Sequence, residues 1–228
     1  MKTIIFDFDG TLTKKNNEIW RNIWKELDAL DIDDKLYNEF SEGKIDYKEW
    51  CKEIEKVYID KKLSKATLDK LINNIEMMDG LEETLKELKK RNYNLCILSG
   101  GINYVIKSLL KDNIKYFEDI KCNIFTFDEN GFIKSIEQED SDEEGKARYI
   151  KKYIKEHNYK PSDIVFVGNG HNDRFVSSSG CHTICLNPNR VNYKDTNIWH
   201  HYIEKTDNLM DIIEVIDKIK GINREVVS

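Results

Sequence analysis

The sequence has no long apolar run and no regular cysteine pattern. No apolar stretch approaches the roughly 18 residues that a membrane-spanning helix needs. Asp7 and Asp9 interrupt the N-terminal apolar stretch before a signal-peptide core could form. The five cysteines are scattered, with no CxxC pair and no histidine at zinc-finger spacing. We therefore expect reduced, mostly buried thiols in a cytoplasmic protein that has no membrane partner.

The chain also has no excess of positive charge. Charged residues make up 34% of the sequence and the net charge is −6. This balance gives no overall attraction for nucleic acid or for anionic membranes. Nucleic-acid binding is therefore not expected, and any anionic ligand must be held by local groups.

Short β-rich apolar segments alternate with amphipathic helical segments along most of the chain. Strands are expected at 3–8, 94–101, 120–125, 163–170 and 182–188. Helical periodicity follows in "MMDGLEETLKELKKRN", with Asp79 as a candidate N-cap, in "GKARYIKKYIKEHN" and in "DNLMDIIEVIDKIKG". A hairpin is expected around Asn130 and Gly131, and the adjacent His200 and His201 are expected in a solvated segment. The alternation predicts an α/β fold with a parallel sheet that is covered on both faces.

Residues 15–78 have a different pattern, with helical periodicity and no strand-like run. We therefore predict a helical domain at 15–78, inserted into an α/β core domain at 1–14 and 79–228. An apolar stripe in the insertion includes Trp20 and Trp24. We expect these side chains in the core of the insertion rather than in a substrate pocket.

Polar side chains gather at the expected carboxyl ends of the strands, where open α/β sheets bind ligands. The candidates are Asp7, Asp9, Ser99, Gly100, Gly101, Asn169 and Asp173, joined by Lys146, which opens the helix before the last of these strands. The set offers carboxylates for a magnesium ion, a hydroxyl, a lysine, and glycines whose amides can approach a ligand closely. Together these groups suit a bound phosphate.

Four motifs, "DFDGTLT", "ILSGG", "GKARYI" and "VGNGHND", occur in this order with β/α spacing. With them, the chain resembles the haloacid dehalogenase superfamily, and most closely its phosphoserine-phosphatase-like branch. The segment "EGKIDYKEW" (42–50) is also similar to the cap of that branch. The resemblance implies a Rossmann-like core, with a small helical cap domain inserted after the first strand.

The resemblance also implies a mechanism. Asp7 would attack the phosphorus and form an aspartyl-phosphate. Asp9 would protonate the leaving oxygen and then deprotonate the attacking water. Ser99 and the amides near Gly100 would hold phosphate oxygens, while Lys146 would pair with Asp7 and with the phosphate.

A magnesium ion is implied as the cofactor, bound by Asp7, the backbone carbonyl of Asp9 and the last motif. Asp173 would fix the ion and its water shell. The family usually has an aspartate where this chain has Asn169. An asparagine still offers an oxygen, but it removes one negative charge, so we expect weaker magnesium binding.

The substrate is less defined than the reaction, and we expect a small phosphorylated metabolite resembling phosphoserine. Glu18 lies near the place of the acidic residue that grips phosphoserine in that branch, whereas "WCKEIEKVY" has no arginine for its carboxylate. Lys52 does not reproduce a planar bidentate clamp. Methylthiopentenyl phosphates, phosphocholine-type esters and nucleotides therefore remain open as substrates. A binding or regulatory protein with weakened catalysis, a phosphomutase and the oligomeric state also remain open.

Overall fold

A seven-stranded sheet with the order β4-β3-β2-β1-β5-β6-β7 forms the centre of the protein. The computed structural model describes residues 1–14, 18–139, 141, 143–188 and 198–221. The strands are β1 (Thr3–Phe6), β2 (Asn94–Ile102), β3 (Asp119–Phe127), β4 (Ile133–Glu137), β5 (Ile164–Gly168), β6 (His182–Leu186) and β7 (His201–Ile203). All neighbouring strands pair in parallel except β3 and β4, which form the hairpin expected around Gly131. The predicted α/β class and parallel sheet are thus confirmed.

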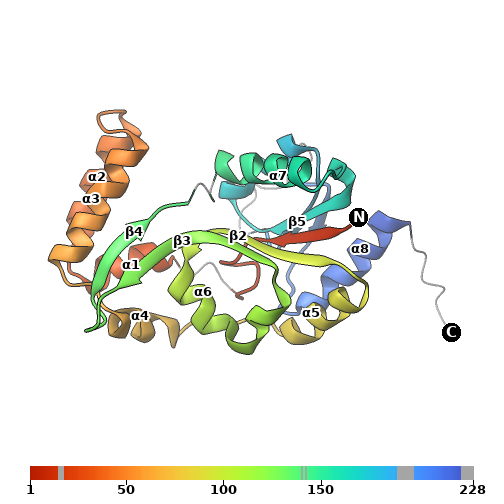
Figure 1. Ribbon diagram of the computed structural model, residues 1–228, viewed down its shortest axis with the longest axis horizontal. Helices are drawn as coiled ribbons and strands as arrows, with labels where there is room; N and C mark the ends of the chain where they lie inside the picture. The colour runs from red at the N-terminus through yellow and green to blue at the C-terminus, as the bar shows by residue number, and fades with distance from the viewer. Residues whose placement is uncertain (15–17, 140, 142, 189–197, 222–228) are drawn as a thin grey trace.

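Helices cover both faces of this sheet (Figure 1). The α-helices of the described residues are α1 (Ile19–Glu26), α2 (Leu30–Ser41), α3 (Tyr47–Asp60), α4 (Lys65–Ile72), α5 (Leu81–Lys90), α6 (Asn103–Leu110), α7 (Glu144–Glu156) and α8 (Ile212–Lys220). Helix α7 lies on one side, while α5, α6 and α8 lie on the other. Within the described residues, no helix is long and apolar enough to cross a membrane.

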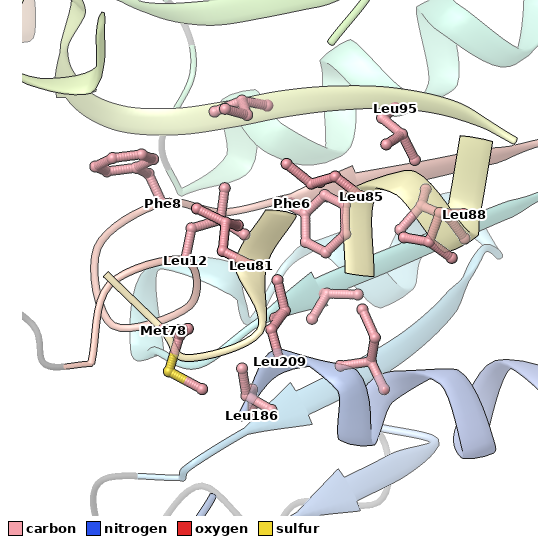
Figure 2. Close-up of a cluster of buried hydrophobic side chains, with 14 of the residues drawn as sticks. Phe6, Phe8, Leu12, Met78, Leu81, Leu85, Leu88, Leu95, Leu186 and Leu209 are labelled. Carbon is pink, nitrogen blue, oxygen red and sulfur yellow. The ribbon is translucent and has the colours of Figure 1, made fainter. Parts of the chain in front are cut away.

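Successive side chains of the central strands point to opposite faces and build two separate cores. Ile4 and Phe6 belong to the cluster beneath α5 and α8, part of which is drawn in Figure 2. Ile5 lies between them and belongs to the cluster on the α7 side. All three side chains are fully buried. Because both faces are covered, β1 reads as a continuous apolar run, and its end is held in one place by packing from two directions.

The helical insertion predicted after the first strand is confirmed, with α1 to α4 lying between β1 and α5. These helices have a core of their own that includes Trp24, and this core continues onto Phe125 and Ile133 of the β3–β4 hairpin. The amide of Lys65 donates to the Gly131 carbonyl at 2.9 Å, which ties α4 to the hairpin turn. The boundaries of the core and cap domains stay a prediction.

One local expectation, the N-cap at Asp79, is wrong. Gly80 rather than Asp79 is the N-cap of α5, because the chain enters the helix in a left-handed conformation (φ 66°) that glycine adopts without strain. Asp79 instead pairs with Lys14 at 3.0 Å. The expectation of a solvated segment at His200 and His201 agrees with the structure, in which His200 is exposed and His201 is partly exposed at the start of the edge strand β7. The ring of His200 also accepts a hydrogen bond from the Thr183 amide at 3.1 Å.

Candidate active site

The register of the parallel strands brings three of the four motifs to one edge of the sheet. Phe6, the last residue of β1, is level with Ile97 in β2 and with Val167 in β5. The amide of Asp7 then donates to the Val167 carbonyl at 2.8 Å, which extends the ladder by one residue. The residues that follow Val167 and Ile97 by two positions are Asn169 and Ser99. The predicted gathering of these side chains at the strand ends therefore follows from the sheet itself.

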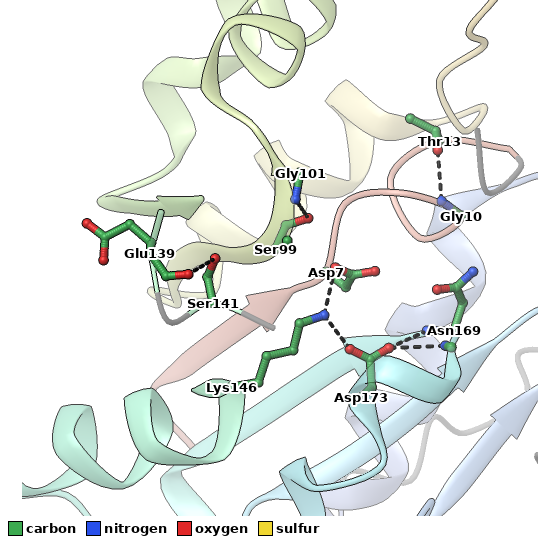
Figure 3. A network of polar contacts seen from close by, with 12 residues as sticks. Asp7, Gly10, Thr13, Ser99, Gly101, Glu139, Ser141, Lys146, Asn169 and Asp173 are labelled. Atoms are coloured by element: carbon green, nitrogen blue, oxygen red, sulfur yellow. Dashed lines mark hydrogen bonds and ion pairs between the residues drawn. The ribbon is translucent and has the colours of Figure 1, made fainter. Parts of the chain in front are cut away.

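Lys146 links two buried carboxylates at this edge (Figure 3). Its ammonium nitrogen lies 3.0 Å from Oδ1 of Asp7 and 2.6 Å from Oδ1 of Asp173. The first turn of α7 carries this lysine, whose side chain is 0% exposed. A fully buried lysine is rare unless its charge is compensated. The structure thus brings together Asp7, Lys146 and Asp173, as a group of one ammonium and two carboxyl groups.

The pKa of Asp7 is shifted by its burial and by the two charged groups beside it. The pKa of the Asp7 carboxyl is raised from 3.8 to about 7, chiefly by burial; Lys146 lowers this pKa and Asp173 raises it. One lysine therefore does not fully compensate the cost of burying both carboxylates. The site as it stands favours the arrival of another positive charge.

Asp173 has little freedom to move. Its Oδ2 accepts hydrogen bonds from the amides of Asn169 and Gly170, each at 3.1 Å, while Oδ1 is held by Lys146. A Cβ on Gly168 would lie 2.4 Å from Oδ2, so only glycine lets the carboxylate come this close to β5. Asp173 therefore orients both Lys146 and the loop that carries Asn169.

Asp9 and Ser99 face each other across Gly101. A Cβ placed on Gly101 would lie 3.2 Å from the Ser99 hydroxyl and 3.3 Å from Oδ2 of Asp9. Asp9 is partly exposed, whereas Asp7 is buried. An exposed carboxylate exchanges protons with water more readily than a buried one, so the two aspartates are suited to different tasks.

Two residues not predicted from the sequence hold the second motif in place. Nε1 of Trp20 donates to the Gly100 carbonyl at 3.0 Å, and Nδ2 of Asn123 donates to the same oxygen at 2.8 Å. A polar residue inside the apolar β3 segment could have indicated a functional role for Asn123. A tryptophan in an apolar stripe, such as Trp20, gives no such indication. Trp24 lies in the cap core as expected, but Trp20 contacts both that core and the site.

The cap residues considered for substrate binding lie at the surface. Glu18 is exposed and precedes α1 in a left-handed conformation (φ 45°). Lys52 is exposed on α3, and its neighbour Ile54 is buried in the cap core. The role of Glu18 in substrate binding stays a prediction.

The donor set at the strand ends fits a hard cation bound through oxygen. Asp7 offers a carboxylate, Asn169 an amide oxygen and Asp9 a backbone carbonyl, and Figure 3 shows the side chains of Asp7 and Asn169 at the same edge of the sheet. Among the described residues, no group of three or more histidine, cysteine, aspartate or glutamate side chains could hold a metal. Magnesium needs no such cage, because it keeps several waters and takes one or two protein carboxylates.

Comparisons with known proteins agree with this arrangement. The profile of the haloacid dehalogenase-like hydrolases matches residues 1–174. A phosphoserine phosphatase from Methanocaldococcus jannaschii is 30% identical over 172 residues, which cover 75% of this chain and 79% of the relative. Another, from Archaeoglobus fulgidus, is 28% identical over 192 residues, which cover 83% of this chain and 54% of the relative.

Solved structures show the same fold. A phosphoserine phosphatase with a phospho-aspartyl intermediate analogue aligns with a TM-score of 0.69 and 26% identity, covering 94% of this chain and 98% of that one. A substrate-bound phosphoserine phosphatase aligns with a TM-score of 0.70 and 26% identity, covering 94% and 97%. The chain therefore belongs to the haloacid dehalogenase-like hydrolases, in their phosphoserine-phosphatase-like branch.

Proposed function

We propose that the protein hydrolyses a small phosphomonoester, with Asp7 as the nucleophile and magnesium as the cofactor. The observation that supports this most is the buried group in which Lys146 contacts both Asp7 and Asp173. A nucleophilic carboxylate must be fixed in direction, and the Lys146 contact at 3.0 Å leaves the second oxygen of Asp7 for attack.

In the first step, an oxygen of Asp7 forms a bond to phosphorus while the bond from phosphorus to the ester oxygen breaks. Asp9 gives a proton to the leaving alcohol. In the second step, Asp9 accepts a proton from water, whose oxygen attacks the same phosphorus, and the bond to Asp7 breaks. The products are the alcohol, inorganic phosphate and the regenerated aspartate, so one difficult displacement becomes two easier ones.

The transferring phosphoryl group needs donors for its oxygens in both steps. The Ser99 hydroxyl and the backbone amides near Gly100, in the last part of β2, and the Lys146 ammonium, which contacts Asp7 from α7, would supply such donors. Because two carboxylates already hold the Lys146 side chain in place, it loses little conformational entropy when the phosphate binds.

Asp7, the Asp9 carbonyl and Asn169 would hold the magnesium ion, and Asp173 would act through a water molecule. When bound, the ion neutralises the charge that otherwise repels an anionic phosphate from an anionic nucleophile. This ligand set has one carboxylate fewer than an aspartate at position 169 would give.

We expect Asn169→Asp to bind magnesium about tenfold or more tightly than the wild type, because the added carboxylate strengthens the attraction for a dication. Isothermal titration with magnesium, without substrate, measures this directly. Asn172→Asp, at the position directly before Asp173, adds the same charge to the same loop and serves as the control. Equal affinities for the wild type and Asn169→Asp would refute the assignment of Asn169 as a ligand.

The relatives are phosphoserine phosphatases by name, and we propose a phosphoserine-like metabolite as the substrate. At the cap helix α3, however, the exposed Lys52 and the buried Ile54 offer no bidentate clamp for a carboxylate. Methylthiopentenyl phosphates, phosphocholine-type esters and nucleotides are therefore the alternatives. The cytoplasmic location, and the absence of nucleic-acid and membrane partners, stay predictions.

A panel of phosphorylated metabolites, assayed for phosphate release with magnesium, tests this proposal. Phosphoserine belongs in the panel because it is the substrate named by the relatives. Release from at least one small monoester, abolished by EDTA, is the expected result. Binding of these compounds without any phosphate release would instead favour a catalytically weakened binding protein, and isomer formation without release would favour a phosphomutase.

A further inference from the structure

The carbonyl of Gly100 is held from two directions by side chains that belong to different parts of the fold. Trp20 reaches it from α1 at 3.0 Å, and Asn123 reaches it from β3 at 2.8 Å. Asn123 is buried and is itself fixed, because its Oδ1 accepts from the Glu139 amide at 3.2 Å. Because two side chains donate to the same oxygen, the orientation of the Gly100 carbonyl is fixed.

The peptide group between Gly100 and Gly101 links the orientation of this carbonyl to Ser99. The Gly100 carbonyl and the Gly101 amide belong to the same planar unit, so fixing one end fixes the other. The Gly101 amide donates to the Ser99 hydroxyl oxygen at 3.1 Å. Since this bond occupies a lone pair of the hydroxyl, the hydroxyl hydrogen must point away from Gly101. Neither glycine has a Cβ that would restrict rotation of the peptide group, so hydrogen bonds must set its orientation.

The indole of Trp20 is in turn held by aromatic neighbours of the cap core. Its ring stacks on Tyr58, with centroids 6.4 Å apart and an interplanar angle of 25°. Phe125 meets it edge-on at 5.5 Å between centroids. Packing against these two rings therefore fixes the position of the Trp20 indole.

We propose that Trp20 is a positioning residue, which orients the Ser99 hydroxyl toward the phosphate through the Gly100–Gly101 peptide group. The packing of α1 against Phe125 thereby affects the orientation of the Ser99 hydroxyl. The effect on turnover rests on the proposed role of Ser99, whereas the effect on the peptide group does not.

Trp20→Phe tests the proposal, because it keeps an aromatic ring among Tyr58 and Phe125 but removes the indole N–H. We expect kcat to fall about tenfold with KM changing less than about threefold, as for the loss of one well-placed hydrogen bond in the transition state. Trp24→Phe is the matched control: Trp24 is 2% exposed and packs on Tyr58 at 4.8 Å between centroids. This control is expected to keep kcat within about twofold, because it leaves the Gly100 carbonyl untouched.

Hydrogen exchange of the Gly101 amide, followed by NMR in the ligand-free protein, gives a readout that needs no turnover. Relative to the amides of β5, the Gly101 amide should exchange about tenfold faster in Trp20→Phe and unchanged in Trp24→Phe. Unchanged Gly101 exchange in Trp20→Phe, or an equal loss of kcat in both variants, would overturn the proposal. If the wild type hydrolyses nothing in the panel, the proposed function fails and the exchange measurement alone decides the role of Trp20.

Discussion

Lys146→Met is expected to lower the free energy of unfolding by about 3 to 5 kcal/mol, since it leaves two buried carboxylates without their cation. Asp7 and Asp173 are 2% and 0% exposed, so water cannot replace the ammonium without opening the site. Methionine approximates the volume of the lysine stem, so the expected effect comes mainly from charge. Urea denaturation in EDTA at pH 8 measures the change.

Lys152→Met is the matched control for this prediction. Lys152 lies on the same helix, its side chain is 73% exposed, and its ion pair with Glu156 spans 3.7 Å. Exposed pairs of this kind contribute roughly 0 to 1 kcal/mol. If the Lys146→Met protein is as stable as the Lys152→Met protein, the Lys146 ammonium does not stabilise the buried carboxylates of Asp7 and Asp173. Magnesium should restore part of the lost stability in Lys146→Met, because a dication can compensate the same carboxylates.

Asp7→Asn is expected to remove turnover by more than about 10³-fold, because an amide cannot form the acyl phosphate. The same substitution should make the metal-free protein more stable at pH 8. Asparagine is nearly isosteric with aspartate and removes one of two negative charges that share Lys146. Loss of activity together with a gain in stability separates a catalytic role from a structural one.

The pH dependence of this gain follows from the titration of Asp7. Burial raises the pKa of Asp7 to about 7 in the folded protein, above its value of 3.8 in an unfolded chain. Between these values the folded state binds more protons, so the contribution of Asp7 to stability falls as pH rises from about 4 to about 7. The free energy of unfolding of Asp7→Asn, relative to that of the wild type, should therefore grow across this range. Each unit by which the folded-state pKa of Asp7 is raised adds about 1.4 kcal/mol, so a difference of at least about 1.4 kcal/mol is expected at pH 8. An advantage that shrinks with rising pH would contradict the electrostatics of the site.

The positions of Asp7 and Asn169 were predictable because each directly follows a short apolar strand, and Ser99 because it lies in the last part of such a strand. Parallel strands end at one edge of the sheet, so strand order was not needed to place these residues together. The contact between Lys146 and Asp173 was not predicted, although both residues were. They are separated by 27 residues, and no local pattern reports which of several carboxylates a lysine will meet.

Other parts of the structure were hidden for different physical reasons. Strand β7 consists of three residues at the edge of the sheet, too short for alternation to be read in the sequence. Asp79 had the spacing of a helix cap, but its backbone hydrogen bonds to the segment around Asn208, and Gly80 begins the helix instead. The bond from Trp20 to Gly100 joins residues 80 positions apart, and an apolar stripe indicates only which face of a helix is buried.

Trapping the phosphorylated enzyme tests the central claim most directly. Wild-type protein is mixed with a substrate identified in the panel and magnesium, quenched in acid during turnover, and digested for mass spectrometry. The account predicts a hydroxylamine-sensitive phosphoryl group on the peptide that contains Asp7, and none in Asp7→Asn. A phosphoryl group on any other residue, or undiminished turnover by Asp7→Asn, would contradict it.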